Sequence, residues 1–341
     1  MPCESPRIGF LGPITGEAAY LGKEQLGFAR YAVRTVGRKE VKLVEEDTQL
    51  DPARAAKAAE RLQADPDVLA VVGPAGSQEA LAVAPFFART PRTPYVSASA
   101  LGAALTNGSI RHFFRVVPSE RAQGPRLARL IRLRLGAKQV AIVDDRSAYS
   151  RGLAGRVQAS LRASAIRVTR LSVDRATTDL GPLAARIPAG ADVVFLPWQI
   201  AANAQALGEE LRARGSAAVL VGSDAVDSGD FELEGSYVTS FAPDVRALPG
   251  NGAFAAGYGR RFVSRFGPPA YVATQAAILA IRKACADGEA TRAEVERNLR
   301  ATAIPRIVLG GSLRFTARGD RAGATFAVFR IGPGGVRTLV R

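Results

Sequence analysis

The feature that most constrains the fold is an apolar run, residues 68–72, that stops abruptly at Gly73-Pro74. An uninterrupted apolar run bounded by breakers is typical of a parallel strand buried on both faces. Ser77 follows it, in a position to cap a helix that runs to about residue 88. A second short strand over residues 94–96 leads into a turn of small residues, 97–101. Because ligands of open α/β sheets bind beyond the carboxyl ends of strands, we interpret this stretch as one wall of a small-molecule site.

Strand and helix patterns alternate along nearly the whole chain, which predicts βαβ units and mainly parallel sheets. The expected strands cover residues 7–11, 41–46, 68–72, 94–96, 113–117, 139–143, 167–171, 192–196, 218–221 and 236–239. The expected helices cover residues 19–36, 52–64, 77–88, 118–135, 152–163, 180–186 and 201–213. A chain of 341 residues is long for one simple core, so the two successive α/β series predict two lobes with a ligand cleft between them.

The last third of the chain departs from this alternation. Residues 251–300 read as mainly helical, and we expect Gly267-Pro268-Pro269 to break this part into two helices. A β-hairpin over residues 325–340, turning at residues 332–335, is expected to end the chain.

The net charge of +15 raises the possibility of nucleic-acid binding. The basic residues are spread along the chain, however, and are 40 Arg to 6 Lys. Four of them, Arg126, Arg129, Arg132 and Arg134, concentrate on one expected helix without interleaved aromatic residues, a helix-turn-helix or zinc spacing. We interpret this row as a solvated helix face and expect no nucleic-acid partner.

Neither the cysteines nor the N-terminal residues indicate the cellular compartment of the protein. No apolar run approaches the roughly 20 residues that cross a bilayer, and the given sequence does not open with a signal-peptide pattern. We expect Cys3 to be a surface cysteine, with the lipid-bearing cysteine of a lipoprotein as the alternative, and Cys285 to be a small core residue. Their spacing indicates neither a metal site nor a disulfide framework.

Sequence signals for catalysis are missing. His112 is the only histidine, and a structural role is expected for it. Walker A and dinucleotide-binding glycine patterns are absent, as is the Gly-x-Ser-x-Gly elbow of hydrolases. The sequence therefore predicts a binding protein without a cofactor or a metal, and not an enzyme.

Several residues that follow strand ends are candidates for ligand contacts. Ser77 could hold a ligand carboxylate together with helix N-terminal amides, and Asp224 could pair with a ligand ammonium. Tyr149 and Trp198 could cover an apolar or cationic ligand. Plain helix capping for Ser77, a turn role for Asp224 and packing for the two aromatic residues stay open as alternatives.

The order of these motifs resembles the periplasmic leucine/isoleucine/valine-binding proteins. The resemblance covers about residues 7–340 and rests on residues 8–16, Glu46-Asp47, Asp51-Pro52, Val72-Gly73 with Ser77, Phe114-Arg115, Gln123-Gly124, Val143-Asp144-Asp145 with Tyr149, Gly152-Leu153-Ala154 and the Gly222 turn. It implies an α/β, two-lobed type I periplasmic-binding-protein fold with three crossovers at the hinge. One lobe would contain residues 1–118 and 244–322, and the other residues 119–243 and 323–341.

The resemblance also implies a site. Ser77 and the turn Ser99-Ala100-Leu101 would hold the ligand carboxylate, Asp224 would hold the amine, and Tyr20, Tyr149 and Trp198 would wall the side chain. Two departures bear on the ligand: the turn lacks the family's usual threonine, and Asp224 stands where branched-chain binders have the longer glutamate.

The expected function is that of the extracytoplasmic solute-binding component of an ABC importer, which closes by a hinge on an amino acid with an apolar or aromatic side chain. An aromatic or aliphatic carboxylate without an amine is the rival ligand, and a cytosolic ligand sensor on the same fold is the rival function. The expected partners are the small-molecule ligand and a membrane permease, and the protein is expected to be monomeric. Its expected location is periplasmic or lipid-anchored outside the cytoplasm, with the cytoplasm as the alternative.

Overall fold

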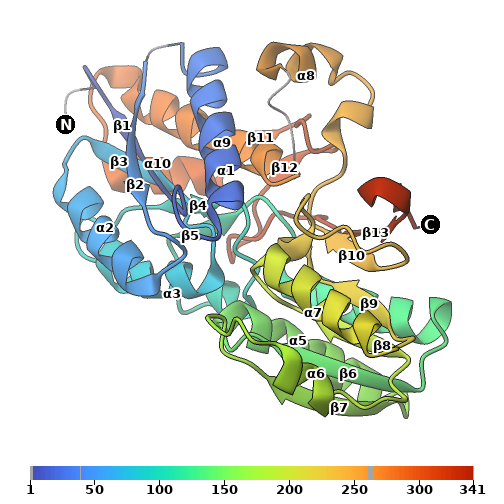
Figure 1. Cartoon of the computed structure of the whole chain (residues 1–341). Coiled ribbons are helices and arrows are strands. Elements are labelled where there is room, and N and C mark those ends of the chain that lie inside the picture. The colour runs from blue at the N-terminus through green and yellow to red at the C-terminus, as the bar shows by residue number, and fades with distance from the viewer. Residues whose placement is uncertain (1–2, 39, 260–264, 341) are drawn as a thin grey trace. The chain divides into compact units, whose positions relative to one another are not determined.

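The computed structural model describes residues 3–38, 40–259 and 265–340 (Figure 1). The chain forms two compact units and passes between them three times. Unit 1 contains Met1–Ser119 and Ala242–Ala324, and unit 2 contains Glu120–Phe241 and Thr325–Arg341. Each unit has its own sheet and its own helices.

The sheet of unit 1 is wholly parallel, with the strand order β2-β1-β3-β4-β5. Its strands are β1 (Arg7–Gly12), β2 (Lys42–Asp47), β3 (Val68–Val72), β4 (Tyr95–Ser97) and β5 (Phe113–Arg115). The central strand β3 coincides with the predicted apolar run, and all five of its residues are buried. Since all strands run the same way, the turns after β3 and β4 meet at one edge of the sheet.

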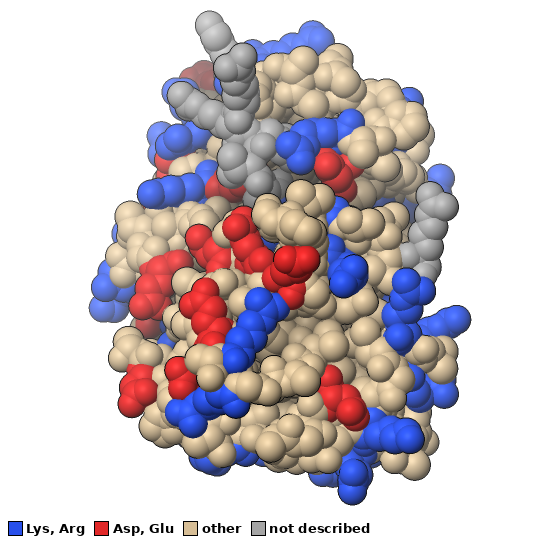
Figure 2. All heavy atoms as spheres, turned by 45° about the vertical axis from the view of Figure 1, so that its right-hand side comes forward, with Lys and Arg blue, Asp and Glu red and all other residues tan. Residues whose placement is uncertain are grey.

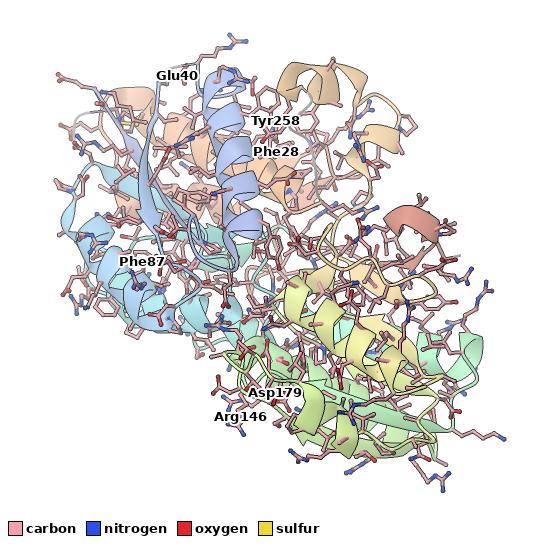
Figure 3. All side chains as sticks on the ribbon, viewed as in Figure 1. Phe28, Glu40, Phe87, Arg146, Asp179 and Tyr258 are labelled. Carbon is pink, nitrogen blue, oxygen red and sulfur yellow. A yellow bond between two sulfur atoms is a disulfide. The ribbon has the colours of Figure 1, made fainter. Side chains whose placement is uncertain are left out.

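The helices of unit 1 come from both of its chain segments. They are α1 (Ala19–Thr35), α2 (Pro52–Ala64), α3 (Ser77–Phe87), α8 (Gly252–Tyr258), α9 (Gly267–Ala284) and α10 (Arg292–Arg300). Helix α2 packs on α3, and α1 packs on α9. Phe28 of α1 stacks on Tyr258 of α8, with 3.8 Å between ring centroids (Figure 3). The two-residue strands β11 (Ala303–Ile304) and β12 (Leu313–Arg314) form a separate small sheet.

The prediction that Gly267-Pro268-Pro269 separates two helices was wrong in its position. These residues form the first turn of α9, and α8 ends earlier, at Tyr258. The first-turn amides of a helix have no partner within the helix, so proline is tolerated there, and its fixed φ angle suits a helix start.

The two cysteines form a disulfide bond, which corrects both sequence-based interpretations of them. Cys3 and Cys285 are joined with 5.7 Å between their Cα atoms, although 282 positions separate them in the sequence. Cys285 follows the end of α9, and the amide of Cys3 also donates to the carbonyl of nearby Gly288 at 2.9 Å. The sulfur of Cys3 is therefore in a disulfide rather than free at the surface, and Cys285 is half-buried rather than part of the core.

The sheet of unit 2 has the strand order β14-β13-β10-β9-β8-β6-β7. Its strands are β6 (Gln139–Asp144), β7 (Arg167–Ser172), β8 (Val193–Leu196), β9 (Val219–Gly222), β10 (Tyr237–Ser240), β13 (Ala327–Ile331) and β14 (Arg337–Leu339). The five strands from β6 to β10 are parallel, and β13 and β14 form the predicted antiparallel hairpin at one edge. This carboxyl-terminal hairpin completes a sheet whose other strands come from the middle of the chain.

Four helices flank this sheet: α4 (Glu120–Arg129), α5 (Ala148–Arg162), α6 (Gly181–Arg186) and α7 (Ala201–Ala213). Helix α4 continues as a π-helical turn over Leu130–Arg134 and packs on α5. Most elements lie within a few residues of their predicted positions, and β3, α2 and α7 coincide with them. Among the described residues, no helix is both long enough and apolar enough to span a bilayer.

Candidate ligand-binding site

Unit 1 brings Ser77 and the turn after β4 together. Gly102 donates its backbone amide to the Ser77 hydroxyl oxygen at 3.0 Å, and the Ser77 side chain is buried. Ser77 is the first residue of α3 and not its cap, because Gly76 holds the N-cap position. The predicted capping role of Ser77 was therefore wrong; its hydroxyl links two turns instead.

The serines of the second turn fix it to the first. The Ser97 hydroxyl donates to the Pro74 carbonyl at 2.6 Å and accepts from the Ala100 amide at 2.9 Å. The Ser99 hydroxyl donates to the Ala75 carbonyl at 2.9 Å. Ser99, Ala100 and Leu101 are all buried, so the structure places the predicted turn next to Ser77 in a rigid, hydrogen-bonded arrangement.

A buried arginine is hydrogen-bonded to the backbone of this turn. Arg115, at the end of β5, is fully buried and donates to the carbonyls of Ala100 and Gly102 at 3.1 and 3.0 Å. It also donates to the Asp320 carboxylate at 2.5 Å and to the Thr106 hydroxyl. A buried charge is tolerated when it is paired and hydrogen-bonded, as Arg115 is. Sequence reasoning assigned Arg115 no role, although a charged residue within the apolar run of residues 113–117 was a usable signal.

Helix α1 carries the predicted Tyr20 and a second side chain near the turn. Tyr20 is half-buried and lies beside Phe266, with 5.8 Å between ring centroids. Gln25, further along α1, donates its side-chain amide to the Ser99 hydroxyl at 2.8 Å. A ligand contact of Tyr20 stays a prediction, and Gln25 is a buried polar residue near the turn that sequence reasoning missed.

In unit 2 the candidate residues gather around Asp224. Tyr149 donates its hydroxyl to the Asp224 carboxylate at 2.7 Å, and the Gln123 side-chain amide donates to the same oxygen. Gln123 also donates to the Thr239 hydroxyl at 2.8 Å. The structure thus brings together Tyr149 and Asp224, which were predicted, and Gln123, which was not.

The electrostatics of Asp224 are unusual. Its side chain is buried, and its hydrogen-bond donors Tyr149 and Gln123 are both neutral. Burial raises the pKa of Asp224 to about 7, because desolvation of the charged form outweighs the donated hydrogen bonds. The carbonyl oxygen of the buried Gln123 side chain has no hydrogen-bond partner among the described residues. The cluster therefore holds two buried acceptor groups that lack a cation.

The loop after β6 carries Tyr149 and is tied to the neighbouring strand end. Ser147 caps α5 by accepting from the Ser150 amide, which places Tyr149 in the first turn of the helix. The buried Asp145 carboxylate accepts from the amides of Ser147 and Gln199, both at 3.0 Å. Burial is the largest influence on Asp145 and raises its pKa. These bonds join the loop after β6 to the loop after β8.

Trp198 lies in the loop after β8. Its indole N–H donates to the Val143 carbonyl at 2.7 Å, and its side chain is buried. The Ser223 hydroxyl donates to the Trp198 carbonyl at 3.1 Å, so the backbone of Trp198 is connected to the turn that carries Asp224. A role of the indole ring as a wall for the ligand stays a prediction.

His112 shows the features of a structural residue. Its side chain is buried and forms a hydrogen bond to the Ala84 carbonyl at 3.2 Å. Burial lowers the pKa of His112, which favours the neutral ring. Within the described part of the chain, no group of three or more His, Cys, Asp or Glu side chains is arranged to hold a metal ion.

Comparisons with known proteins agree with this architecture. The family model described as "Periplasmic binding protein" matches residues 5–335. The Leu/Ile/Val-binding protein BraC3 of Rhizobium johnstonii is 25% identical over 340 residues, which cover 95% of this chain and 90% of that protein.

Two solved structures show the same fold. The leucine binding protein LivK of Thermotoga maritima has a TM-score of 0.89 at 22% identity, with 98% of each chain covered. A solute binding protein of R. palustris, solved in complex with 4-hydroxybenzoate, has a TM-score of 0.84 at 20% identity and covers 99% of this chain and 95% of its own. The family match over nearly the whole chain, together with the two α/β units, shows that this chain belongs to the periplasmic binding protein family and is a solute-binding protein, not an enzyme.

Proposed function

We propose that this protein binds an amino acid with an apolar or aromatic side chain for an ABC importer. Asp224 holds the ammonium group, and Ser77 with residues 99–101 holds the carboxylate. Closure about a hinge between a lobe of residues 1–118 and 244–322 and a lobe of residues 119–243 and 323–341 selects the liganded state, because both lobes then contact the ligand. The observation that carries the proposal is the buried Asp224 carboxylate, whose donors are all neutral.

An ammonium group suits the Asp224 cluster chemically. A desolvated carboxylate is costly unless a cation pairs with it. The Gln123 carbonyl oxygen is a second buried acceptor, and no described residue donates to it. An ammonium carries three N–H donors, enough to reach both acceptors at once.

The Ser77 turn suits a carboxylate. The Ser77 oxygen accepts from the Gly102 amide, while its own proton has no acceptor among the described residues. A ligand carboxylate can take that proton's hydrogen bond at the N-terminus of α3, where the helix dipole also favours an anion.

The test is the pH dependence of binding, measured by calorimetry with leucine and with 4-methylpentanoate, which lacks the amine. Because the pKa of Asp224 is about 7, we expect leucine affinity to fall roughly tenfold for each pH unit below about 7, as the carboxylate becomes protonated. The Asp224→Asn variant should bind leucine weakly at every pH and lose this dependence. Leucine binding that is unaffected by Asp224→Asn would refute the ammonium assignment.

A carboxylate without an amine is the second candidate ligand. With a pKa of about 7, Asp224 is protonated in a substantial fraction of molecules near neutral pH, and a neutral Asp224 tolerates an apolar or hydroxyl-bearing ligand group. The R. palustris protein of the same fold binds 4-hydroxybenzoate. Tighter binding of 4-methylpentanoate or 4-hydroxybenzoate than of any amino acid would favour this candidate.

The disulfide supports an extracytoplasmic location and disfavours the cytosolic sensor. Disulfides persist in oxidising compartments and are rare in the cytosol. The bond between Cys3 and Cys285 also occupies the thiol that a lipoprotein anchor would need. Detection of both cysteines as free thiols in protein taken directly from cells would contradict this location.

A further inference from the structure

We propose that unit 2 carries a docking surface for anionic phospholipid bilayers. The surface, here called the basic edge, combines arginines of α4 and its π-helical turn with the C-terminal hairpin. Its members are Arg126, Arg129, Arg132, Leu133, Arg134, Arg330 and Leu339. The inference is independent of the ligand that the site around Asp224 binds.

The first observation is a run of basic residues that contains no acidic residue. Residues 121–138 contain six Lys and Arg and no Asp or Glu. Arg126, Arg129, Arg132 and Arg134 are exposed, and none of the four forms an ion pair among the described residues. Several exposed arginines elsewhere, such as Arg30, are paired with carboxylates. On the face drawn in Figure 2, Lys and Arg crowd the lower right border, whereas Asp and Glu gather mostly in the middle and on the left.

The second observation is that large apolar side chains are exposed beside these charges. Leu133 is 57% exposed and stands between two arginines of the row. Leu339, on the outermost strand β14, is 53% exposed. Leu133 precedes Arg134, which lines the same groove as Leu339. Exposed apolar surface rimmed by polar residues marks interaction sites.

The third observation is a groove that is lined both by a residue of the arginine row and by the C-terminal hairpin. It has a volume of about 420 Å³ and is lined by Arg134, Arg330, Gly332, Thr338, Leu339 and Val340. No carboxylate is among these residues, and two guanidinium groups come from segments that are far apart in the sequence. Guanidinium groups bind phosphate oxygens through paired hydrogen bonds, so the groove suits a lipid phosphate.

The combination favours a bilayer over other polyanions. Arginines placed at the headgroups and leucines inserted at the acyl boundary are the two contributions that hold a protein at an anionic membrane surface. Single-stranded nucleic acids are usually bound with aromatic stacking, and no aromatic residue lines the groove. The arginine row looks like a solvated face in the sequence because Arg330 and Leu339 join it only in the folded unit.

The test is co-sedimentation of the whole protein with vesicles of phosphatidylcholine containing about 30% phosphatidylglycerol, against vesicles of phosphatidylcholine alone. We expect binding to the anionic vesicles at low ionic strength and roughly tenfold weaker binding at about 0.3 M salt, since charges near a surface are screened. The triple variant Arg132→Glu, Arg134→Glu and Arg330→Glu should weaken binding by about 100-fold or more, because each surface cation contributes on the order of a fivefold factor. The double variant Leu133→Ser and Leu339→Ser should weaken it several-fold.

A matched control variant distinguishes an effect of the basic edge from an effect of net charge. The variant Arg54→Glu, Lys57→Glu and Arg186→Glu has the same change in charge at exposed positions outside the basic edge. It should bind vesicles more than tenfold tighter than the triple variant, and circular dichroism checks that both variants fold. Absence of binding to anionic vesicles, or equal losses in the two variants, would overturn the proposal. Patch-dependent binding to DNA or to an acidic protein without binding to vesicles would also overturn it.

Discussion

Each unit contains a buried ionisable side chain at or beside the predicted site residues. The two side chains differ in whether a charge of opposite sign pairs with them. Arg115 in unit 1 is satisfied within the protein: a carboxylate, a hydroxyl and two carbonyls accept its hydrogen bonds. Asp224 in unit 2 accepts hydrogen bonds from Tyr149 and Gln123, which are both neutral, and burial raises its pKa to about 7. Arg115 is thus paired within the protein, and the proposed ligand contact falls to Asp224, which has no counter-charge among the described residues.

The largest expected effect comes from removing the paired charge. Arg115→Ala leaves Asp320 and the carbonyls of Ala100 and Gly102 without their donor. Breaking one side of a buried ion pair costs about 3–5 kcal/mol, so we expect a loss of that order in the free energy of unfolding by urea. Arg115→Lys keeps the charge but not the forked geometry and should lose less. A loss of less than about 1 kcal/mol for Arg115→Ala would show that the pairing of Arg115 does not stabilise the fold in the way proposed.

Removing the charge of Asp224 should instead raise the free energy of unfolding of the ligand-free protein. Asp224 has a pKa of about 7 in the folded protein and about 3.9 in an unfolded chain, so the folded state binds the proton more tightly. The native protein should therefore lose stability as pH rises from about 4 to about 7, and carry the full penalty above that. Asp224→Asn removes the penalty and keeps an acceptor for Tyr149 and Gln123.

We expect Asp224→Asn to raise the free energy of unfolding by up to a few kcal/mol at pH 8 and to change it little at pH 4. Urea unfolding of ligand-free protein at the two pH values measures both numbers. A destabilised variant at pH 8 would mean that the carboxylate is paired inside the protein after all.

The smallest expected effect on stability comes from removing the Ser77 hydroxyl in unit 1. Ser77→Ala deprives the Gly102 amide of its acceptor, which should cost about 1–2 kcal/mol of stability. Thr93→Val, which removes a hydrogen bond to the Gln63 side chain before β4 and outside the proposed site, is the matched variant. If Ser77 binds the ligand carboxylate, Ser77→Ala should also weaken binding beyond what Thr93→Val does at equal loss of stability. Equal effects on binding would leave Ser77 with a structural role only.

Local patterns were sufficient to predict much of the fold. The apolar run at β3, the proline at the start of α2 and the closing hairpin are each specified by neighbouring residues, and the structure has them where the sequence predicts them. The grouping of Tyr149 with Asp224 was also predictable, because the carboxyl ends of parallel strands lie at one edge of a sheet.

Features that depend on distant contacts were not predictable in this way. The partner of Cys3 lies 282 positions away, and no spacing rule covers such a distance. Gln123 acquires its importance only from folding beside Asp224. The cap of α3 was assigned one residue too late because glycine and serine both serve at such positions, and the hydrogen bond from Gly102 to Ser77 decides between them.

The disulfide between Cys3 and Cys285 also joins the two chain segments of unit 1 covalently. Cys3 precedes β1 in the first segment, and Cys285 follows α9 in the second. The bond closes residues 3–285 into a covalent ring. A single protease cut between the two cysteines would therefore open the ring without releasing a fragment.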